Sequence, residues 1–324
     1  MRDQSLQVLR AIASLLVVFV HSINYLIVRG VSFPDELIKY KFIGDVGVDI
    51  FFVLSGYVMM LAIERYCDPK IFLIRRLIRI WPLYIFYSLL LFLSYLLVNP
   101  EALDFFNVIK SIFFIPSHID NYHFLPFLGP GWTLGYEFIF YIVIFLSLFF
   151  KSKWMIPVFI LFIVLLGTIF NTGYSQYYLN SILIEFLYGV LIFKMLSKYD
   201  VNIWMIIAVG GAAVYSFAII EFQLDPARFY KYGFLAVFIF LLVKYITLNN
   251  KLLLLIGDAS YTLYLMHMAL GFQVYWKIFG GMNLSVWHLL FLIVFLVVLS
   301  LILYEVVEKK MMVLFQGKLR QFYG

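Results

Sequence analysis

The first apolar segment of the chain carries a polar stripe whose residues could move a proton. Arg10 and His21 stand eleven residues apart, so on a helix they share one face and lie about 16 Å apart along the axis. Ser14 and Asn24 extend the same stripe. An imidazole exchanges protons near neutral pH, whereas a guanidinium stays charged, so His21 is the candidate base. Ionisable groups in an apolar helix usually serve a function, although a structural polar seam against another helix is the alternative.

A second cluster of candidates lies in the basic run FLIRRLIRIWPLY, which contains Arg75, Arg76 and Arg79. On a helix, Arg75 and Arg79 share a face, and Arg76 points elsewhere. Guanidinium groups offer forked donors that suit phosphate oxygens, which would make the cluster a site for a polyanionic cofactor. Arginines beside an apolar segment can equally be topology determinants, and the run alone does not separate the two interpretations.

The segment FLPFLGPGWTLGYEFIFY brings together Trp132, Tyr136 and Glu137. An indole, a phenol and a carboxylate could hold a sugar ring and its hydroxyl groups. Trp and Tyr also gather at membrane interfaces without binding anything, so this interpretation stays open as well. Glu137 lies several residues inside an apolar run and therefore needs a partner.

Other ionisable residues have simpler interpretations. His267 ends the string GDASYTLYLMH, where a lone histidine is more often a packing or hydrogen-bonding residue than a catalyst. Asp45 and Asp49 lie one turn apart and favour the start of a helix through its dipole. No set of Cys, His and acidic residues has the spacing of zinc or iron ligands, and no nucleotide-binding glycine motif is present, so no metal is expected.

The elements that must position these residues follow from composition. The chain has 324 residues, of which 65% are hydrophobic and 13% charged. A soluble domain carries roughly 25% charged residues, so this surface must face an apolar medium. The net charge of +6 comes from Lys and Arg in short loops between apolar runs, which is typical of membrane topology and excludes nucleic acid as a partner.

Apolar runs near 20 residues long predict an all-α, polytopic membrane bundle in which residues 1–324 form one domain. We predict ten spans, at residues 6–28, 44–63, 77–98, 131–150, 154–171, 179–197, 202–221, 231–247, 252–275 and 286–308. The stretch from Phe105 to Ile115 is too short to cross and is expected to be a re-entrant or interfacial helix. With the N-terminus inside, the inner side holds 17 of the 24 Lys and Arg residues and the outer side holds 7, among them Arg228 and Lys231. Both termini are therefore predicted to be cytoplasmic, with Cys67 on the inner side.

Five strings together resemble the acyltransferase-3 family of bacterial membrane proteins. They are LQVLRAIASLLVVFVHS, GVDIFFVLSGYVM, FLIRRLIRIWPLY, GWTLGYEFIFY and GDASYTLYLMH, and they occur in the family's order over nearly the whole chain. The pair Arg10 and His21 matches the family's signature in the first helix. The opening string and the short length are most similar to the branch that acetylates exopolysaccharides. Two departures are Phe138, where the family often has a second acidic residue, and Lys310, where it commonly has proline.

The resemblance implies transfer of an acetyl or similar short acyl group from cytoplasmic acyl-CoA to a hydroxyl of a cell-surface polysaccharide or its lipid-linked precursor. It implies these roles: His21, Arg10 and Glu137 in catalysis; Arg75, Arg76, Arg79 and Arg10 in binding acetyl-CoA; Trp132, Tyr136 and Asp49 in binding the acceptor. His21 could act as a general base or become transiently acylated. The implied location is the bacterial cytoplasmic (inner) membrane, and a polysaccharide-synthesis complex is a possible partner. A transporter or flippase for a glycan or small carboxylate is the rival function, although the chain has no inverted repeat.

Overall fold

The computed structural model describes residues 3–65, 68–98, 100–118, 124–170, 173–219, 228–282 and 284–323. Cys67, whose side of the membrane the charge pattern predicts, lies outside the described residues. The described chain is helical almost throughout, with one pairing of two-residue strands, β1 (Ser117–His118) and β2 (Phe124–Leu125). The predicted all-α class is therefore confirmed.

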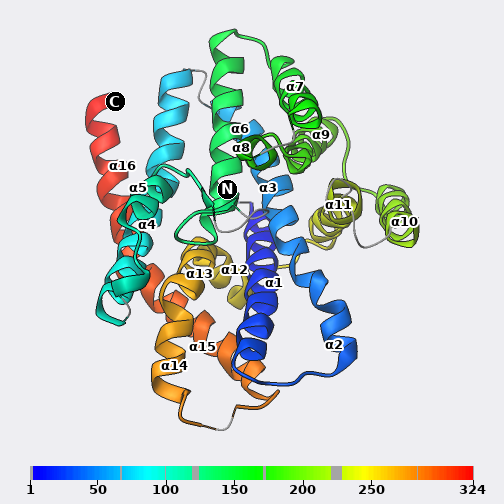
Figure 1. Cartoon of the computed structure of the whole chain (residues 1–324). Coiled ribbons are helices and arrows are strands. Elements are labelled where there is room, and N and C mark those ends of the chain that lie inside the picture. Colours follow the sequence, from blue (N-terminus) through cyan, green and yellow to red (C-terminus); the bar gives the residue numbers. More distant parts are fainter. Residues whose placement is uncertain are drawn as a thin grey trace. The chain divides into compact units, whose positions relative to one another are not determined.

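Figure 1 labels the helices in chain order. Their bounds are α1 Gln4–Val28, α2 Asp35–Tyr40, α3 Val46–Arg65, α4 Pro69–Val98, α5 Phe105–Ile112, α6 Gly131–Phe149, α7 Met155–Ile169, α8 Tyr174–Tyr178, α9 Ile184–Leu196, α10 Ile203–Ile219, α11 Arg228–Ile246, α12 Lys251–Asp258, α13 Ser260–Met266, α14 Phe272–Phe279, α15 His288–Leu303 and α16 Lys309–Tyr323. The π-helical turns η5 (His267–Gly271) and η6 (Tyr304–Glu308) follow α13 and α15.

Each of the ten predicted spans coincides with helical residues, but the helices differ in length. Within the described chain, six are long and apolar enough to cross a membrane: Gln4–Val28, Asp35–Arg65, Pro69–Val98, Gly131–Phe149, Arg228–Ile246 and His288–Phe315. A bent pair, α12 with Ser260–Phe279, would be a seventh, and α7 and Ile203–Phe217 are shorter apolar helices. By length and composition these helices are candidate membrane spans, and the number ten stays a prediction.

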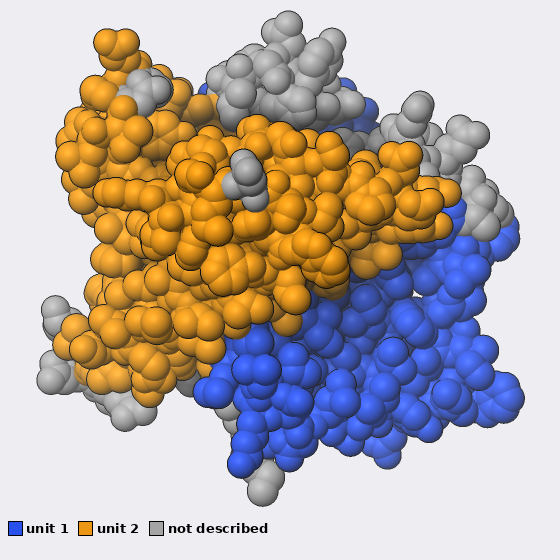
Figure 2. All heavy atoms as spheres, turned by 90° about the horizontal axis from the view of Figure 1, so that it is seen from below, with its two compact units in different colours: residues 1–13, 45–74, 136–257 blue, residues 14–44, 75–135, 258–324 orange. Residues whose placement is uncertain are grey.

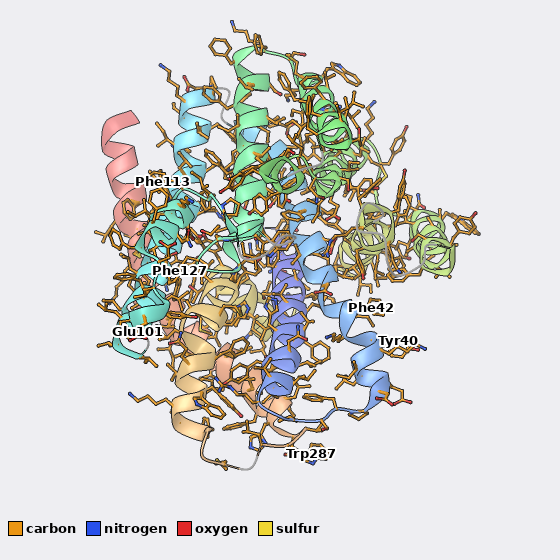
Figure 3. All side chains as sticks on the ribbon, viewed as in Figure 1. Tyr40, Phe42, Glu101, Phe113, Phe127 and Trp287 are labelled. Carbon is orange, nitrogen blue, oxygen red and sulfur yellow. The ribbon has the colours of Figure 1, made fainter. Side chains whose placement is uncertain are left out.

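The distribution of side chains is that of a membrane protein. Large apolar residues are exposed: Val158 on α7 is 60% exposed, and Trp287, in the turn before α15, is 84% exposed (Figure 3). A few ionisable residues are buried: Asp49 and Glu185 have no exposed surface, and Lys231 is 4% exposed. Charges that face the interior of an apolar bundle are costly and indicate function or firm pairing.

The chain divides into two compact units, which Figure 2 colours separately. Unit 1 comprises residues 1–13, 45–74 and 136–257, and unit 2 comprises residues 14–44, 75–135 and 258–324. The division falls within the continuous helices α1, α4 and α6. Unit 1 therefore holds Arg10, Asp49, Tyr136 and Glu137, whereas unit 2 holds the other predicted site residues: His21, Arg75, Arg76, Arg79 and Trp132.

In unit 1, helices α3 and α9 are in backbone contact. A Cβ atom added to Gly56 would lie 2.1 Å from the carbonyl oxygen of Phe186, and one added to Gly189 would lie 2.0 Å from that of Val53. Only glycine fits either position. Two acidic residues of these helices, Asp49 on α3 and Glu185 on α9, are buried near each other.

In unit 2, the short helix α5 is tied to α4. Asp104 caps α5 by accepting from the backbone N–H groups of Phe106 and Asn107. The indole N–H of Trp81 on α4 donates to the carbonyl of Ile112 at 2.8 Å. The predicted short helix between Phe105 and Ile115 is confirmed, and at eight residues α5 is too short to cross a membrane.

Candidate active site

The most informative arrangement in unit 2 is a pair of imidazoles. His21 extends from α1, and His267 opens the π-helical turn η5. Nδ1 of His21 lies 2.7 Å from Nε2 of His267, and the two rings stack at 17° with centroids 5.0 Å apart. His267 is fully buried and His21 is half-buried. The pair thus has one member that is shielded from water and one whose surface is partly exposed.

The hydrogen bonds of His267 determine the tautomers of both rings. Nδ1 of His267 lies 3.0 Å from the carbonyl oxygen of Leu263, which can only accept, so this nitrogen carries a proton. In neutral His267, Nε2 is then an acceptor, and Nδ1–H of His21 must donate to it. Nε2 of neutral His21 is left with a free lone pair. This is the nitrogen that can accept a proton from a substrate.

Helix α13 holds His267 in place through bonds to two other helices of unit 2. The hydroxyl of Thr262 donates to Glu308 at 2.6 Å, and the hydroxyl of Tyr261 donates to the carbonyl of Ile80 at 2.7 Å. The turn that follows is π-helical, and such insertions in α-helices often occur at functional sites. The string GDASYTLYLMH therefore builds a fixed platform that ends in His267.

Aromatic rings pack around the imidazole pair. Phe272 meets the ring of His267 edge-on at 5.7 Å and stacks on Tyr25 at 4.5 Å. The hydroxyl of Tyr25 donates to the carbonyl of Phe272 at 3.2 Å. On another side, Tyr264 lies 6.3 Å from His267 and shares a hydrogen bond of 2.8 Å with the hydroxyl of Thr133. These contacts restrict the rings and exclude water from His267.

The cluster formed by Arg75, Arg76 and Arg79, called the α4 arginines below, lies inside a helix that begins at Pro69 rather than near residue 77. Arg75 and Arg76 are half-buried and Arg79 is exposed. The cavity described beside Arg79 has a volume of only about 10 Å³, which is too small for a nucleotide. The predicted role of these arginines in binding a cofactor stays a prediction.

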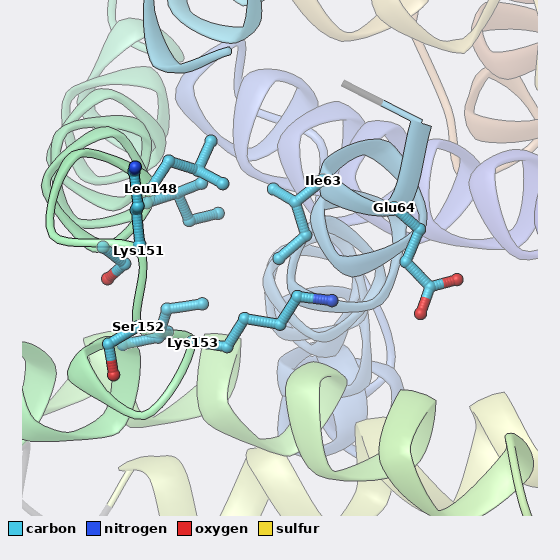
Figure 4. A pocket seen from close by; sticks show the side chains of 9 residues that line it. Ile63, Glu64, Leu148, Lys151, Ser152 and Lys153 are labelled. Atoms are coloured by element: carbon cyan, nitrogen blue, oxygen red, sulfur yellow. The ribbon is translucent and has the colours of Figure 1, made fainter. Parts of the chain in front are cut away.

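A larger cavity of about 540 Å³ lies in unit 1 and is lined in part by two lysine side chains (Figure 4). Lys151 and Lys153 come from the turn after α6, and Ile63 and Glu64 come from the end of α3. The side chain of Lys153 extends across the cavity towards α3. The volume of this cavity falls in the range of small-molecule sites. Lys151 and Lys153 are therefore an alternative to the α4 arginines as cations that could bind a cofactor.

Glu137 and Tyr136 have partners within unit 1. Glu137 is half-buried and accepts hydrogen bonds from the hydroxyls of Ser55, at 3.4 Å, and Tyr141. The predicted need for a partner is met. Tyr136 is buried, and its hydroxyl donates to the carbonyl of Tyr177. Trp132, in unit 2, is half-buried.

The sequence predicts only a helix-dipole interaction for Asp49, but in the structure Asp49 also forms an ion pair with Arg228. Nε and Nη2 of Arg228 donate to its two carboxylate oxygens at 3.0 and 2.8 Å. Glu185 is fully buried beside Asp49 and Arg228. The charge count placed Arg228 in an outer loop, whereas this residue begins α11 and reaches into the interior of unit 1. Within the described residues, no group of three or more His, Cys, Asp or Glu side chains could hold a metal ion.

Comparison with known proteins identifies the family to which the chain belongs. A family model described as an acyltransferase domain matches residues 3–305, and the chain belongs to this acyltransferase-3 family. The exopolysaccharide production protein ExoZ of Rhizobium meliloti (strain 1021) is similar, with 32% identity over 69% of this chain and 76% of the relative. No solved structure matches the chain. The resemblance to the family, drawn from five strings, is confirmed.

Proposed function

We propose that the protein moves an acetyl or similar short acyl group from acyl-CoA to a hydroxyl group of an exopolysaccharide or its lipid-linked precursor. Membership of the acyltransferase-3 family supports acyl transfer, and similarity to an exopolysaccharide production protein supports a glycan acceptor. The observation that carries the proposal is the imidazole pair, in which the partly exposed His21 has an unprotonated Nε2 atom. A hydroxyl group is a weak nucleophile and needs such a base.

In the proposed reaction, the acceptor oxygen attacks the carbonyl carbon of the thioester while its O–H bond breaks. The proton goes to Nε2 of His21. The C–S bond then breaks, and the imidazolium returns the proton to the leaving sulfur, so the products are an ester and the CoA thiol. Throughout, Nδ1–H of His21 donates to Nε2 of His267. His267 is thus a positioning residue that holds the ring and its tautomer and stabilises the transient imidazolium, as a carboxylate does in a serine protease triad.

The remaining predicted roles form part of the proposal. The donor is cytoplasmic acetyl-CoA, whose phosphates contact the α4 arginines and Arg10. Glu137, Trp132, Tyr136 and Asp49 act on the acceptor side, with Glu137 assisting catalysis. Each role can be tested by whether the Michaelis constant for the donor or for the acceptor changes.

We further propose ten spans in a bacterial cytoplasmic membrane, with both termini in the cytoplasm and a possible association with polysaccharide-synthesis enzymes. The 17-to-7 distribution of Lys and Arg supports the orientation. Two of the cations counted on the outer side are not loop residues: Arg228 pairs with the buried Asp49, and Lys231 is itself buried. They therefore count less as topology signals than lysines and arginines in loops do.

The deciding experiment uses purified protein in sealed proteoliposomes with labelled acetyl-CoA and a glycan fraction from polysaccharide-producing cells. Label in the glycan together with release of free CoA thiol is the expected result. His21→Ala should lose about 10²- to 10⁴-fold in turnover, which is the usual contribution of general-base assistance. A folded His21→Ala variant that transfers at the wild-type rate would refute the mechanism. Glycan movement across the membrane without acetylation would favour the transporter instead.

A further inference from the structure

A cavity of about 810 Å³ opens in unit 2 and has no role in the proton transfer described above. Its walls come from the C-terminal ends of α1 and α4 and from η5 and α14. The residues that carry the argument are Tyr25, Arg29, Trp276 and Lys277, with Leu97 and Val98 at the edge. The volume lies within the usual range for sites that bind small molecules.

One wall of this cavity is the aromatic layer that packs on the imidazole pair. Tyr25 lies one turn beyond His21 on α1 and lines the cavity, as does Phe272. Phe272 contacts Tyr25 with one part of its ring and His267 with another. A ligand in the cavity therefore lies one side chain away from the site of proton transfer.

The mouth of the cavity combines positive charge with aromatic surface. Arg29 places its guanidinium carbon 4.0 Å from the ring centroid of Trp276 and 5.4 Å from that of Tyr25. Stacking holds the guanidinium plane while its N–H edges stay available for an anion. Lys277 adds a second exposed cation. Trp276 is 37% exposed, and its aromatic surface can pack against the C–H groups of a sugar ring.

The third feature of the cavity is an apolar edge at the end of α4. Leu97 is 84% exposed and Val98 is 83% exposed, and both line the cavity. Arg29 follows Val28, the last residue of α1, so the positive charge lies at the end of a predicted span, where lipid phosphates also lie. Cations, aromatic faces and an apolar edge together suit an amphiphile with an anionic linkage.

We propose that this cavity binds the acceptor as a sugar joined through a phosphate linkage to a lipid. The linkage contacts Arg29 and Lys277, the sugar packs against Tyr25 and Trp276, and the lipid chain passes Leu97 and Val98. This inference rests on the proposed function, because it names the acceptor of that reaction.

Binding of defined probes to the purified protein in nanodiscs of uncharged lipid tests this inference. The probes are a hexose on a short polyprenyl diphosphate, the same hexose on the uncharged polyprenol, and a soluble acidic oligosaccharide. The diphosphate probe should bind at least about tenfold more tightly than the other two, since a single charge-assisted contact contributes that much. Arg29→Gln and Lys277→Gln should each reduce this preference about tenfold. Lys39→Gln, an exposed lysine of unit 2 that does not line the cavity, should leave it unchanged.

Three results would overturn the inference. They are equal or absent binding of the charged and uncharged lipid-linked probes, an unchanged preference in the Arg29 and Lys277 variants, and equally tight binding of the acidic oligosaccharide. The acetyl-transfer assay with His21→Ala separates this failure from failure of the proposed function. His21-dependent transfer with no effect of Arg29→Gln would refute the acceptor site alone.

Discussion

Replacing His267 tests whether the buried imidazole positions the reacting one. His267→Leu removes the acceptor of a hydrogen bond of 2.7 Å and leaves Nδ1–H of His21 without its partner. Leaving a buried donor unsatisfied costs about 1–3 kcal/mol, and it also frees the ring to rotate or change tautomer. If this cost falls only on the transition state, where His21 becomes a cation and the bond strengthens, turnover should fall roughly 5- to 150-fold. The Michaelis constants for donor and acceptor should change little, because His267 is fully buried and offers no surface to a substrate.

The conservative variant makes this prediction specific. In His267→Gln, the amide oxygen can accept from His21, and the amide N–H can donate to Leu263, so much of the lost turnover should return. His288→Gln is the matched control, because His288 bonds to Ser285 at the start of α15 and lies outside the pair. The assay is acetyl transfer to glycan under saturating acetyl-CoA, with thermal unfolding of each variant measured in parallel. A folded His267→Leu enzyme with wild-type turnover, or a Gln variant no better than Leu, would refute the positioning role.

Three further predictions follow from the site. Triple substitution of the α4 arginines by Gln should raise the Michaelis constant for acetyl-CoA about tenfold or more, since each charge-assisted contact contributes roughly 1.5–3 kcal/mol. Substitution of Lys151 and Lys153 by Gln is the control and should leave this constant unchanged. A raised constant in the lysine variant and an unchanged one in the arginine variant would place the donor site in the cavity lined by the lysines. Glu137→Gln should slow transfer to sugar while acetyl-CoA binding is retained, and lost donor binding would contradict its acceptor-side role. Reporter fusions after Gly324 and in the loop near residue 171 should give opposite signals, and equal signals would refute the ten-span orientation.

The elements were predictable because a membrane imposes a simple rule on composition. A helix must present about 20 apolar residues to cross, so each crossing leaves a long apolar run in the sequence. The predicted segments accordingly fall on helices, including the short α5. Helix starts were less predictable: α4 begins at Pro69, and Arg75 and Arg76 lie within the helix because their long side chains can reach water from inside it.

The contacts between helices were not predictable, since spacing along one helix contains no information about its neighbour. His21 and His267 are 246 residues apart, and His267 taken alone has the properties of a packing residue. A chemical argument could have found His267. A histidine base such as His21 in an apolar helix needs a hydrogen-bond acceptor for its second ring nitrogen, and few side chains in the apolar spans can provide one. The same argument applies to Asp49 and Arg228. A buried carboxylate such as Asp49 requires a cation as its partner. Arg228, at the start of an apolar helix, is therefore better interpreted first as the ion-pair partner of a buried acid and only then as a topology signal.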